Sequence, residues 1–285
     1  MLLLGILLFA ALCALWAGCT AGLLAAVLAL LGGFVGGLLL VLLFLVVASF
    51  AVNRDKVQEN DSKFYRAMAH LYIDLAITLG RIDVRAEGFE KAPKNGRILL
   101  VCNHLHEIDP AIIMKCLPKA QLAFIAKRET KNMPIISHVM HKLMCPLINR
   151  ENDREALKTI LHCIDLLKQD KVSIGVFPEG YVSMDGRIRH FRGGVFKIAQ
   201  KAGVPVVVCT ISNTKQVIRD LLHLRRTFVR IHLVDVLDAE TVKATPTVEL
   251  AEQIYEIMIS DLGEKYRCEE RATHPDEQVR AEPIE

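Results

Sequence analysis

The stretch ILLVCNHLHEIDP, residues 98–110, indicates both a fold class and a chemistry. Its first five residues, 98–102, form an apolar run of the kind found in buried strands. His104 and Asp109 follow directly, five positions apart. A histidine at a strand end can act as a general base, and a nearby carboxylate can accept its other ring N–H and fix the tautomer. The stretch therefore predicts a His/Asp pair at the end of a strand.

A second apolar run has the same layout. Residues 172–177, VSIGVF, lead into Pro178, Glu179 and Gly180. In open α/β sheets, ligands bind beyond the carboxyl ends of the strands. Two such strand ends can therefore share one cleft, and we expect the two stretches to meet there.

Apolar runs alternate with helix-like stretches through most of the chain. The apolar runs are residues 98–102, 121–126, 172–177, 204–211 and 228–236. The helix-like stretches are residues 110–117, 132–144, 151–169, 193–202 and 247–262. This alternation predicts an α/β fold with a mixed, largely parallel sheet flanked by helices.

The two stretches together resemble the glycerolipid acyltransferase family, which includes the 1-acylglycerol-3-phosphate acyltransferases. The resemblance runs from about residue 75 to about residue 240. It implies that His104 and Asp109 form the catalytic dyad and that Glu179, with Gly180, helps to hold the glycerol part of the acceptor.

The resemblance also implies a phosphate site. Lys127 and Arg150 each follow an apolar run, at points where the family places the residues that bind the acceptor's phosphate. An ammonium and a guanidinium suit that role, because the guanidinium can bind a phosphate with two parallel bonds. Arg154 is left out of this set, since a solvated charge near a helix start explains it equally well.

The chain departs from the family pattern at two positions. Tyr181 stands where the family has a threonine after Glu179, so a hydroxyl contact would have to come from the phenol or from Ser183. His106 stands where a small residue is usual, and it either contacts the acceptor or is inert. A metal site is not expected, because Ile108 and Asp109 occupy the positions where an H-x-H-x-D-H run would have two of its ligands.

Asp109 has a structural alternative. An aspartate followed by Pro110 is a good helix start, and Asp109 could serve as an N-cap. The two roles are compatible, since a capping carboxylate has a second oxygen to offer to an imidazole.

The N-terminal segment is free of charged side chains from Met1 to Asn53. This exceeds the ~20 residues needed to cross the hydrocarbon core once, and it lacks the basic start of a signal peptide. We expect a membrane-embedded helical hairpin over residues 1–53. Its turn falls at residues 18–20 or at the glycine pairs of residues 32–37, which could equally be a helix-packing surface.

The first charges after this segment, Arg54 and Lys56, favour a catalytic domain on the cytoplasmic face. Residues 62–79 have the spacing of an amphipathic helix, which either lies on the bilayer or packs on the domain. We expect an acyltransferase domain over residues 54–263 and a polar, disordered tail over residues 264–285. None of the eight cysteines forms a C-x-x-C pair, which favours reduced thiols.

Basic clusters at residues 187–192 and 224–230 could face anionic lipid or the phosphates of an acyl carrier, or could be solvated. They lack the interleaved aromatics of a nucleic-acid site, so no nucleic-acid partner is expected.

The resemblance, taken with the charge-free N-terminal segment, thus implies a membrane-bound O-acyltransferase. It would move a fatty acyl group from acyl-CoA or acyl-carrier protein, as co-substrate and without a cofactor, to the sn-2 hydroxyl of 1-acylglycerol 3-phosphate (lysophosphatidic acid), giving phosphatidic acid. Its expected partners are membrane lipids, this acceptor and the acyl donor. The alternatives are another acceptor, such as glycerol 3-phosphate, another lysophospholipid or an amino-acid lipid, and a non-catalytic lipid-binding scaffold.

Overall fold

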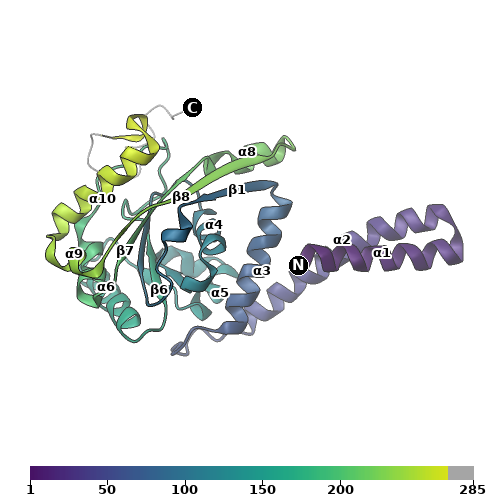
Figure 1. Ribbon diagram of the computed structural model, residues 1–285. Helices are drawn as coiled ribbons and strands as arrows, with labels where there is room; N and C mark the ends of the chain where they lie inside the picture. The colour runs from purple at the N-terminus through teal and green to yellow at the C-terminus, as the bar shows by residue number, and fades with distance from the viewer. Residues whose placement is uncertain (269–285) are drawn as a thin grey trace. The chain divides into compact units, whose positions relative to one another are not determined.

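The computed structural model describes residues 1–268 and contains two compact units (Figure 1). The first unit comprises residues 1–76 and 131–143, and the second comprises residues 77–130 and the chain from Met144 onward. The sequence predicted boundaries at residues 53 and 263, which separate a membrane-embedded segment and a disordered tail from the catalytic domain. The two compact units are defined by packing, so they do not test those boundaries. That division stays a prediction.

The first unit begins with a hairpin of two apolar helices, α1 (Leu2–Ala21) and α2 (Leu23–Phe50). Both are long and apolar enough to cross a membrane. The turn between them is Gly22, whose φ of 88° suits glycine. It lies two residues beyond the first of the two predicted turn positions.

One glycine of each pair in α2 packs against α1, which supports the packing alternative for Gly33 and Gly37. A Cβ on Gly33 would come within 2.9 Å of the Ala10 Cα, and one on Gly37 within 3.2 Å of the Ile6 side chain. A Cβ on Gly32 would have no atom of α1 within 4 Å. Small residues on one face therefore let the two helices approach closely.

Two further helices complete the first unit, α3 (Lys63–Leu79) and α5 (Ile136–Lys142). The hydroxyls of Tyr65 and Tyr72 donate to the carbonyls of Ala48 and Val41 in α2. The predicted amphipathic helix is thus present, and its tyrosines pack it against the second apolar helix.

The second unit is built on a six-stranded sheet in the order β1-β8-β7-β2-β6-β3. The strands are β1 (Ile82–Glu87), β2 (Leu99–Cys102), β3 (Leu122–Phe124), β6 (Ser173–Val176), β7 (Val206–Ser212) and β8 (Thr227–Leu237). Only the β7–β8 pair is antiparallel. The mixed, largely parallel sheet predicted from the alternation is confirmed. A separate two-stranded sheet pairs β4 (Ala126–Lys127) with β5 (Leu147–Ile148).

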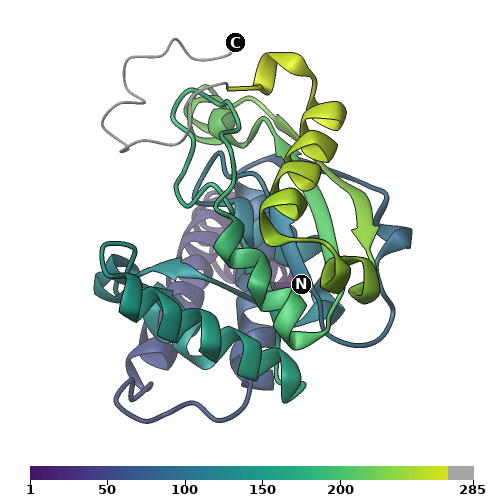
Figure 2. The ribbon, with the colours of Figure 1, turned by 90° about the vertical axis from the view of Figure 1, so that its left-hand side faces the viewer.

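Helices surround this sheet. They are α4 (Asp109–Cys116), α6 (Asp153–Lys168), α7 (Lys197–Ala202), α8 (Val217–Leu222), α9 (Ala239–Ala244) and α10 (Thr247–Leu262). Figure 2 looks onto the face that α6 and α10 cover. On that face Leu99 and Val101 of β2 join the main core, opposite Ile174 and Val176 of β6. Consecutive buried residues on both faces explain why the central strands read as continuous apolar runs.

The C-terminal segment is ordered further than the sequence indicated. The disordered tail was predicted to begin at residue 264, but residues 264–266 form a 3-10 helix, and Cys268 is buried. Tyr255 explains the difference, because its hydroxyl bonds to the Cys268 backbone within the core. The rest of the predicted tail, residues 269–285, lies outside the described residues.

Candidate functional site

The parallel pairing of β2 with β6 brings the two sequence stretches together. Val101 lies opposite Val176 in the sheet, so the loops that follow both strands leave from the same edge. The backbone N–H of His104 donates to Glu179 Oε1 at 3.1 Å, and its carbonyl accepts from the Ser183 N–H at 2.8 Å. The predicted shared cleft therefore has both of its loops in direct contact.

His104 and Asp109 form a hydrogen-bonded pair. His104 Nδ1 lies 2.9 Å from Asp109 Oδ2, and the carboxylate is fully buried. The same oxygen accepts the backbone N–H groups of Leu105 at 2.7 Å and His106 at 2.8 Å. Because Asp109 occupies Nδ1, the other ring nitrogen, Nε2, is the atom left to take a proton.

Asp109 does not cap the helix. It is the first residue of α4, and the residue before it, Ile108, makes no side-chain capping bond. Its carboxylate reaches back into the preceding loop instead. The N–H groups of Ala111 and Ile112 donate to the Ile108 carbonyl, and Pro110 has none, so the start of α4 is satisfied within the chain. The capping alternative is wrong, and the pair with His104 is the role that the structure supports.

Aromatic stacking fixes the His104 ring. The ring lies 3.9 Å from that of Phe177, centroid to centroid and nearly parallel, and Phe177 in turn stacks on Phe124 at 5.4 Å. Phe124 needs the glycine at 175, since a Cβ there would come within 2.5 Å of its ring. His104 is thus held on one edge by Asp109 and on one face by Phe177.

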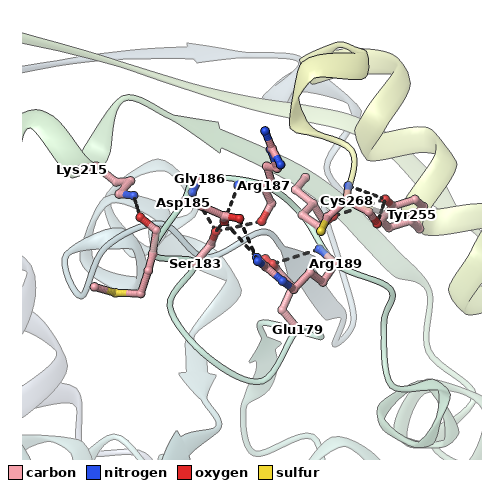
Figure 3. Close-up of polar contacts among 11 residues, drawn as sticks. Glu179, Ser183, Asp185, Gly186, Arg187, Arg189, Lys215, Tyr255 and Cys268 are labelled. Carbon is pink, nitrogen blue, oxygen red and sulfur yellow. Dashed lines mark hydrogen bonds and ion pairs between the residues drawn. The ribbon is translucent and has the colours of Figure 1, made fainter. Parts of the chain in front are cut away.

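Glu179 lies beneath the site rather than on its surface, and Figure 3 shows it among its polar neighbours. Its side chain is 1% exposed, and its second oxygen accepts the Arg189 N–H at 3.4 Å. Burial raises the pKa of Glu179 to about 8, although the N–H groups of His104 and Arg189 act against this shift. The carboxyl thus ties together the loops that contain His104 and Arg189.

A buried ion pair shapes the loop after Glu179. The guanidinium of Arg189 makes two bonds to Asp185, at 2.8 and 2.9 Å, and both side chains are almost fully buried (Figure 3). Burial opposes ionisation of Asp185, but the bonds and charge of Arg189, together with the bonds from the Arg187 N–H and from Ser183, outweigh it and hold the pKa of Asp185 below its ordinary value. Ser183 donates to Asp185 and to the Arg187 carbonyl, so its hydroxyl serves the loop.

Arg150 lies beside the turn at Gly180. Gly180 has a φ of 86°, and a Cβ there would lie 4.0 Å from the Arg150 Cζ. Burial, followed by the proximity of Arg192, lowers the pKa of Arg150. Glu129 acts against this shift, so Arg150 has both a second guanidinium and a carboxylate near it, beside the Glu179 loop. Arg150 and Arg192 are the two cations of this group. Such a pair creates an attractive position for an anion.

Lys127 is connected to this group indirectly. It lies on β4 opposite Ile148, its side chain is 62% exposed, and its ammonium is 3.8 Å from Glu129, the carboxylate that also raises the pKa of Arg150. Among the described residues, no hydrogen bond or ion pair links Lys127 directly to Arg150 or to Glu179. The structure thus brings together five of the six predicted site residues, and Lys127 is related to them through Glu129.

The two residues that depart from the family pattern, His106 and Tyr181, differ in their hydrogen bonding. His106 Nδ1 accepts the Ile108 N–H at 3.2 Å, which gives this histidine a role in folding its own loop. The Tyr181 hydroxyl is buried without a hydrogen-bond partner among the described residues. Burial and the nearby Glu179 raise the pKa of Tyr181. Neither the buried phenol of Tyr181 nor the bonded hydroxyl of Ser183 is therefore free to donate a hydrogen bond to a ligand.

Two contributors to the site were missed from the sequence. Asn103 bonds to both the N–H and the carbonyl of Ile211, which anchors the His104 loop to β7. Arg192 was read only as part of a basic cluster, and its position after Phe191 and before two glycines gave no separate signal. The signal that could have found Asn103 is its place directly after a buried strand.

Glu179 gives a prediction for stability. In the unfolded chain the Glu179 carboxyl has its ordinary pKa of 4.5, and in the folded protein its pKa is about 8. Between these two pH values the folded state therefore holds one more proton than the unfolded state. The free energy of unfolding should therefore fall as pH rises from about 5 to about 8. Glu179→Gln should remove this fall. Melting temperatures in detergent across that range measure it, with the exposed Glu151→Gln as control, and parallel curves for all three proteins would contradict the raised pKa.

Comparison with known proteins agrees with this arrangement. Residues 83–212 match the family model described as Acyltransferase. The chain is 28% identical over 174 residues to the 1-acyl-sn-glycerol-3-phosphate acyltransferase of Borreliella burgdorferi, an alignment that covers 60% of this chain and 69% of that protein. It is 31% identical over 156 residues to the chloroplastic 1-acyl-sn-glycerol-3-phosphate acyltransferase LPAT1 of Arabidopsis thaliana, covering 54% of this chain and 43% of that protein.

A solved structure shows the same fold. The crystal structure of the 1-acyl-sn-glycerophosphate acyltransferase PlsC from Thermotoga maritima aligns with a TM-score of 0.59 at 27% identity, over 80% of this chain and 89% of that chain. Residues 83–212 therefore form an acyltransferase domain, and the comparisons support an O-acyltransferase of the 1-acylglycerol-3-phosphate acyltransferase type.

Proposed function

We propose that this protein transfers a fatty acyl group from an acyl thioester to the free sn-2 hydroxyl of 1-acylglycerol 3-phosphate, which yields phosphatidic acid. The observation that carries the proposal is the 2.9 Å bond between His104 Nδ1 and the buried Asp109, in contact with the Glu179 loop. A buried base with a fixed tautomer suits the activation of an alcohol. The names of the relatives supply the acceptor class.

In the proposed reaction, His104 Nε2 takes the proton of the acceptor hydroxyl while its oxygen attacks the thioester carbonyl. The negative charge of Asp109 stabilises the imidazolium that results. The tetrahedral intermediate then expels the thiol, which recovers the proton from His104. One C–O bond forms, one C–S bond breaks, and the histidine ends in its starting state.

Direct transfer is favoured over a covalent acyl-enzyme. The hydroxyl of Ser183 is buried and bonded within its own loop. Cys102 is fully buried, and burial raises the pKa of its thiol well above the ordinary value. A nucleophile would need exposure and activation, which these two groups lack.

The acceptor's phosphate is proposed to bind Arg150 together with Arg192. The charge of Arg192 lowers the pKa of Arg150 and Glu129 offsets this only in part, so a dianionic phosphate would stabilise both guanidiniums. Lys127 would assist from the edge of the site through longer-range attraction. Glu179 would act on the glycerol part by fixing the loops around it, because its own carboxyl is buried.

The membrane setting is proposed from the apolar hairpin. Two helices of sufficient length and hydropathy would anchor the chain, and Arg54 and Lys56 would keep the second unit on the cytoplasmic side. Acyl-CoA or acyl-carrier protein would serve as co-substrate, with no bound cofactor.

The central test is an activity panel with His104→Ala. Purified full-length protein in lipid–detergent micelles receives labelled acyl-CoA or acyl-carrier protein against 1-acylglycerol 3-phosphate, glycerol 3-phosphate and another lysophospholipid. We expect labelled phosphatidic acid, and a loss on the order of 10²- to 10⁴-fold with His104→Ala. His106→Asn, which keeps an acceptor for the Ile108 N–H, should stay within a few fold.

Each other outcome has a meaning. A preferred product from another acceptor would reassign the substrate within the same chemistry. No product from any pair would favour the non-catalytic scaffold and refute the enzyme. Activity of His104→Ala close to that of the wild type would show that the base is another residue.

Asp109→Asn separates charge from geometry. The asparagine oxygen can still accept from Leu105 and His106, and its amide replaces an oxygen, Oδ1, that already lacks a partner. The melting temperature should therefore change little. The turnover number should fall on the order of 10²-fold or more, because a neutral amide does not stabilise an imidazolium. Unchanged turnover would reduce Asp109 to an anchor of the loop.

Arg150→Ala tests the phosphate site. Loss of a charged hydrogen bond should raise KM for 1-acylglycerol 3-phosphate on the order of tenfold to a hundredfold, with a smaller effect on turnover. The Arg150→Ala variant should use monoacylglycerol, which lacks the phosphate, at least as well as the wild type does. Arg154→Ala, an exposed arginine on α6, is the matched control. Equal KM values for the two variants would exclude Arg150 as a phosphate ligand.

A further inference from the structure

An apolar and basic surface surrounds α8, and the proposed reaction does not use it. We call it the α8 surface. Its apolar members are Met184, Ile218, Leu222 and Leu224, and its basic members are Lys215, Arg219, Arg225 and Arg226. Leu222 and Leu224 are 78% and 74% exposed. Large apolar side chains that gather at one exposed place indicate an interaction site.

The helix itself separates a core face from an outer face. Val217 is buried, whereas Ile218 and Leu222, four residues apart, both stand exposed on one side. The turn that follows presents Leu224 with a φ of 56°. This is the position after a helix where glycine is usual, because other residues are strained there. A leucine held in that conformation and left in solvent serves no packing purpose in this chain.

The charge around these side chains is positive. Residues 215–226 contain four basic groups and one acidic group, Asp220, which gives a net charge of +3. Asp220 accepts from the Thr227 hydroxyl at 3.1 Å and from the Arg225 backbone through its own carbonyl, so it serves the turn. Apolar tips ringed by arginines match the interface of an anionic bilayer, where the tips enter the acyl region and the cations meet phosphates.

The α8 surface also adjoins the candidate site. The Lys215 ammonium donates to the Met184 carbonyl (Figure 3), and Met184 follows Ser183, whose N–H bonds to the His104 carbonyl. A lipid surface in contact with α8 would therefore lie next to the loop that contains Glu179. A lipid acceptor would then have a short path from bilayer to site.

We propose that the α8 surface docks the second unit onto an anionic lipid bilayer, as a contact additional to the apolar hairpin. The inference concerns lipid contact alone and goes beyond the proposed function. A bilayer is favoured over an acidic carrier protein because the leucines project from a helix end and its turn. An apolar anchor residue on a protein partner would instead require a pocket.

The sole tryptophan of the chain, Trp16, allows a clean test. In a Trp16→Phe background, Leu222→Trp places a single reporter on the α8 surface. Val248→Trp is the matched control, because Val248 is 77% exposed on α10. Both full-length proteins are reconstituted into vesicles that contain phosphatidylglycerol and lipids brominated on their acyl chains. We expect at least twofold stronger quenching of the Leu222→Trp reporter than of the Val248→Trp reporter.

Charge dependence completes the test. Vesicles of phosphatidylcholine alone, high salt, or Arg225→Glu with Arg226→Glu should each reduce the quenching of the Leu222→Trp reporter toward the control. Equal quenching at both positions would overturn the proposal. A shift of the Leu222→Trp emission on addition of acyl-carrier protein in detergent, without lipid quenching, would assign the surface to the carrier and overturn it too. These readouts do not depend on turnover, so they stand or fall separately from the proposed reaction.

Discussion

The peptide groups on either side of His104 join the two halves of the candidate site. The N–H donates to Glu179 and the carbonyl accepts from Ser183, so the loop after β6 holds the loop after β2 in place. Side-chain contacts complete this arrangement, because Asp109 holds the ring edge and Phe177 its face. The position of the proposed base is therefore a property of both loops, and it depends on the parallel pairing that aligns their strands.

The two buried carboxyls of the site do different work because their partners differ. Asp109 accepts from two backbone groups and from the imidazole, and an ionised carboxylate suits all three bonds. Glu179 accepts from two backbone N–H groups alone, and burial raises its pKa to about 8. A carboxyl that is 1% exposed cannot reach an acceptor without movement of the loops. The geometry thus favours Glu179 as the residue that positions the histidine loop.

The sequence was sufficient for the features that depend on local pattern. Continuous apolar runs predicted the buried strands, and the places of His104 and Glu179 after those runs predicted that the two loops meet. Contacts between residues far apart in the chain could not be predicted from the sequence. The antiparallel return of β8 and the burial of Cys268 depend on packing partners far along the chain. The capping alternative for Asp109 failed for another reason: its bonds are local, but they run back to residues 104–106 instead of forward into the helix.

The arginines of residues 187–192 show how burial assigns different roles to one residue type. Arg189 is almost fully buried, and Asp185 neutralises its charge within the protein. Arg192 lies close enough to Arg150 to lower the pKa of Arg150. A sequence pattern counts both as members of one basic cluster, yet the structure pairs Arg189 with Asp185 and leaves the charge of Arg192 to act on Arg150. Because Asp185 neutralises Arg189, this pair stabilises the loop and leaves Arg150 and Arg192 as the guanidiniums that the proposed phosphate would meet.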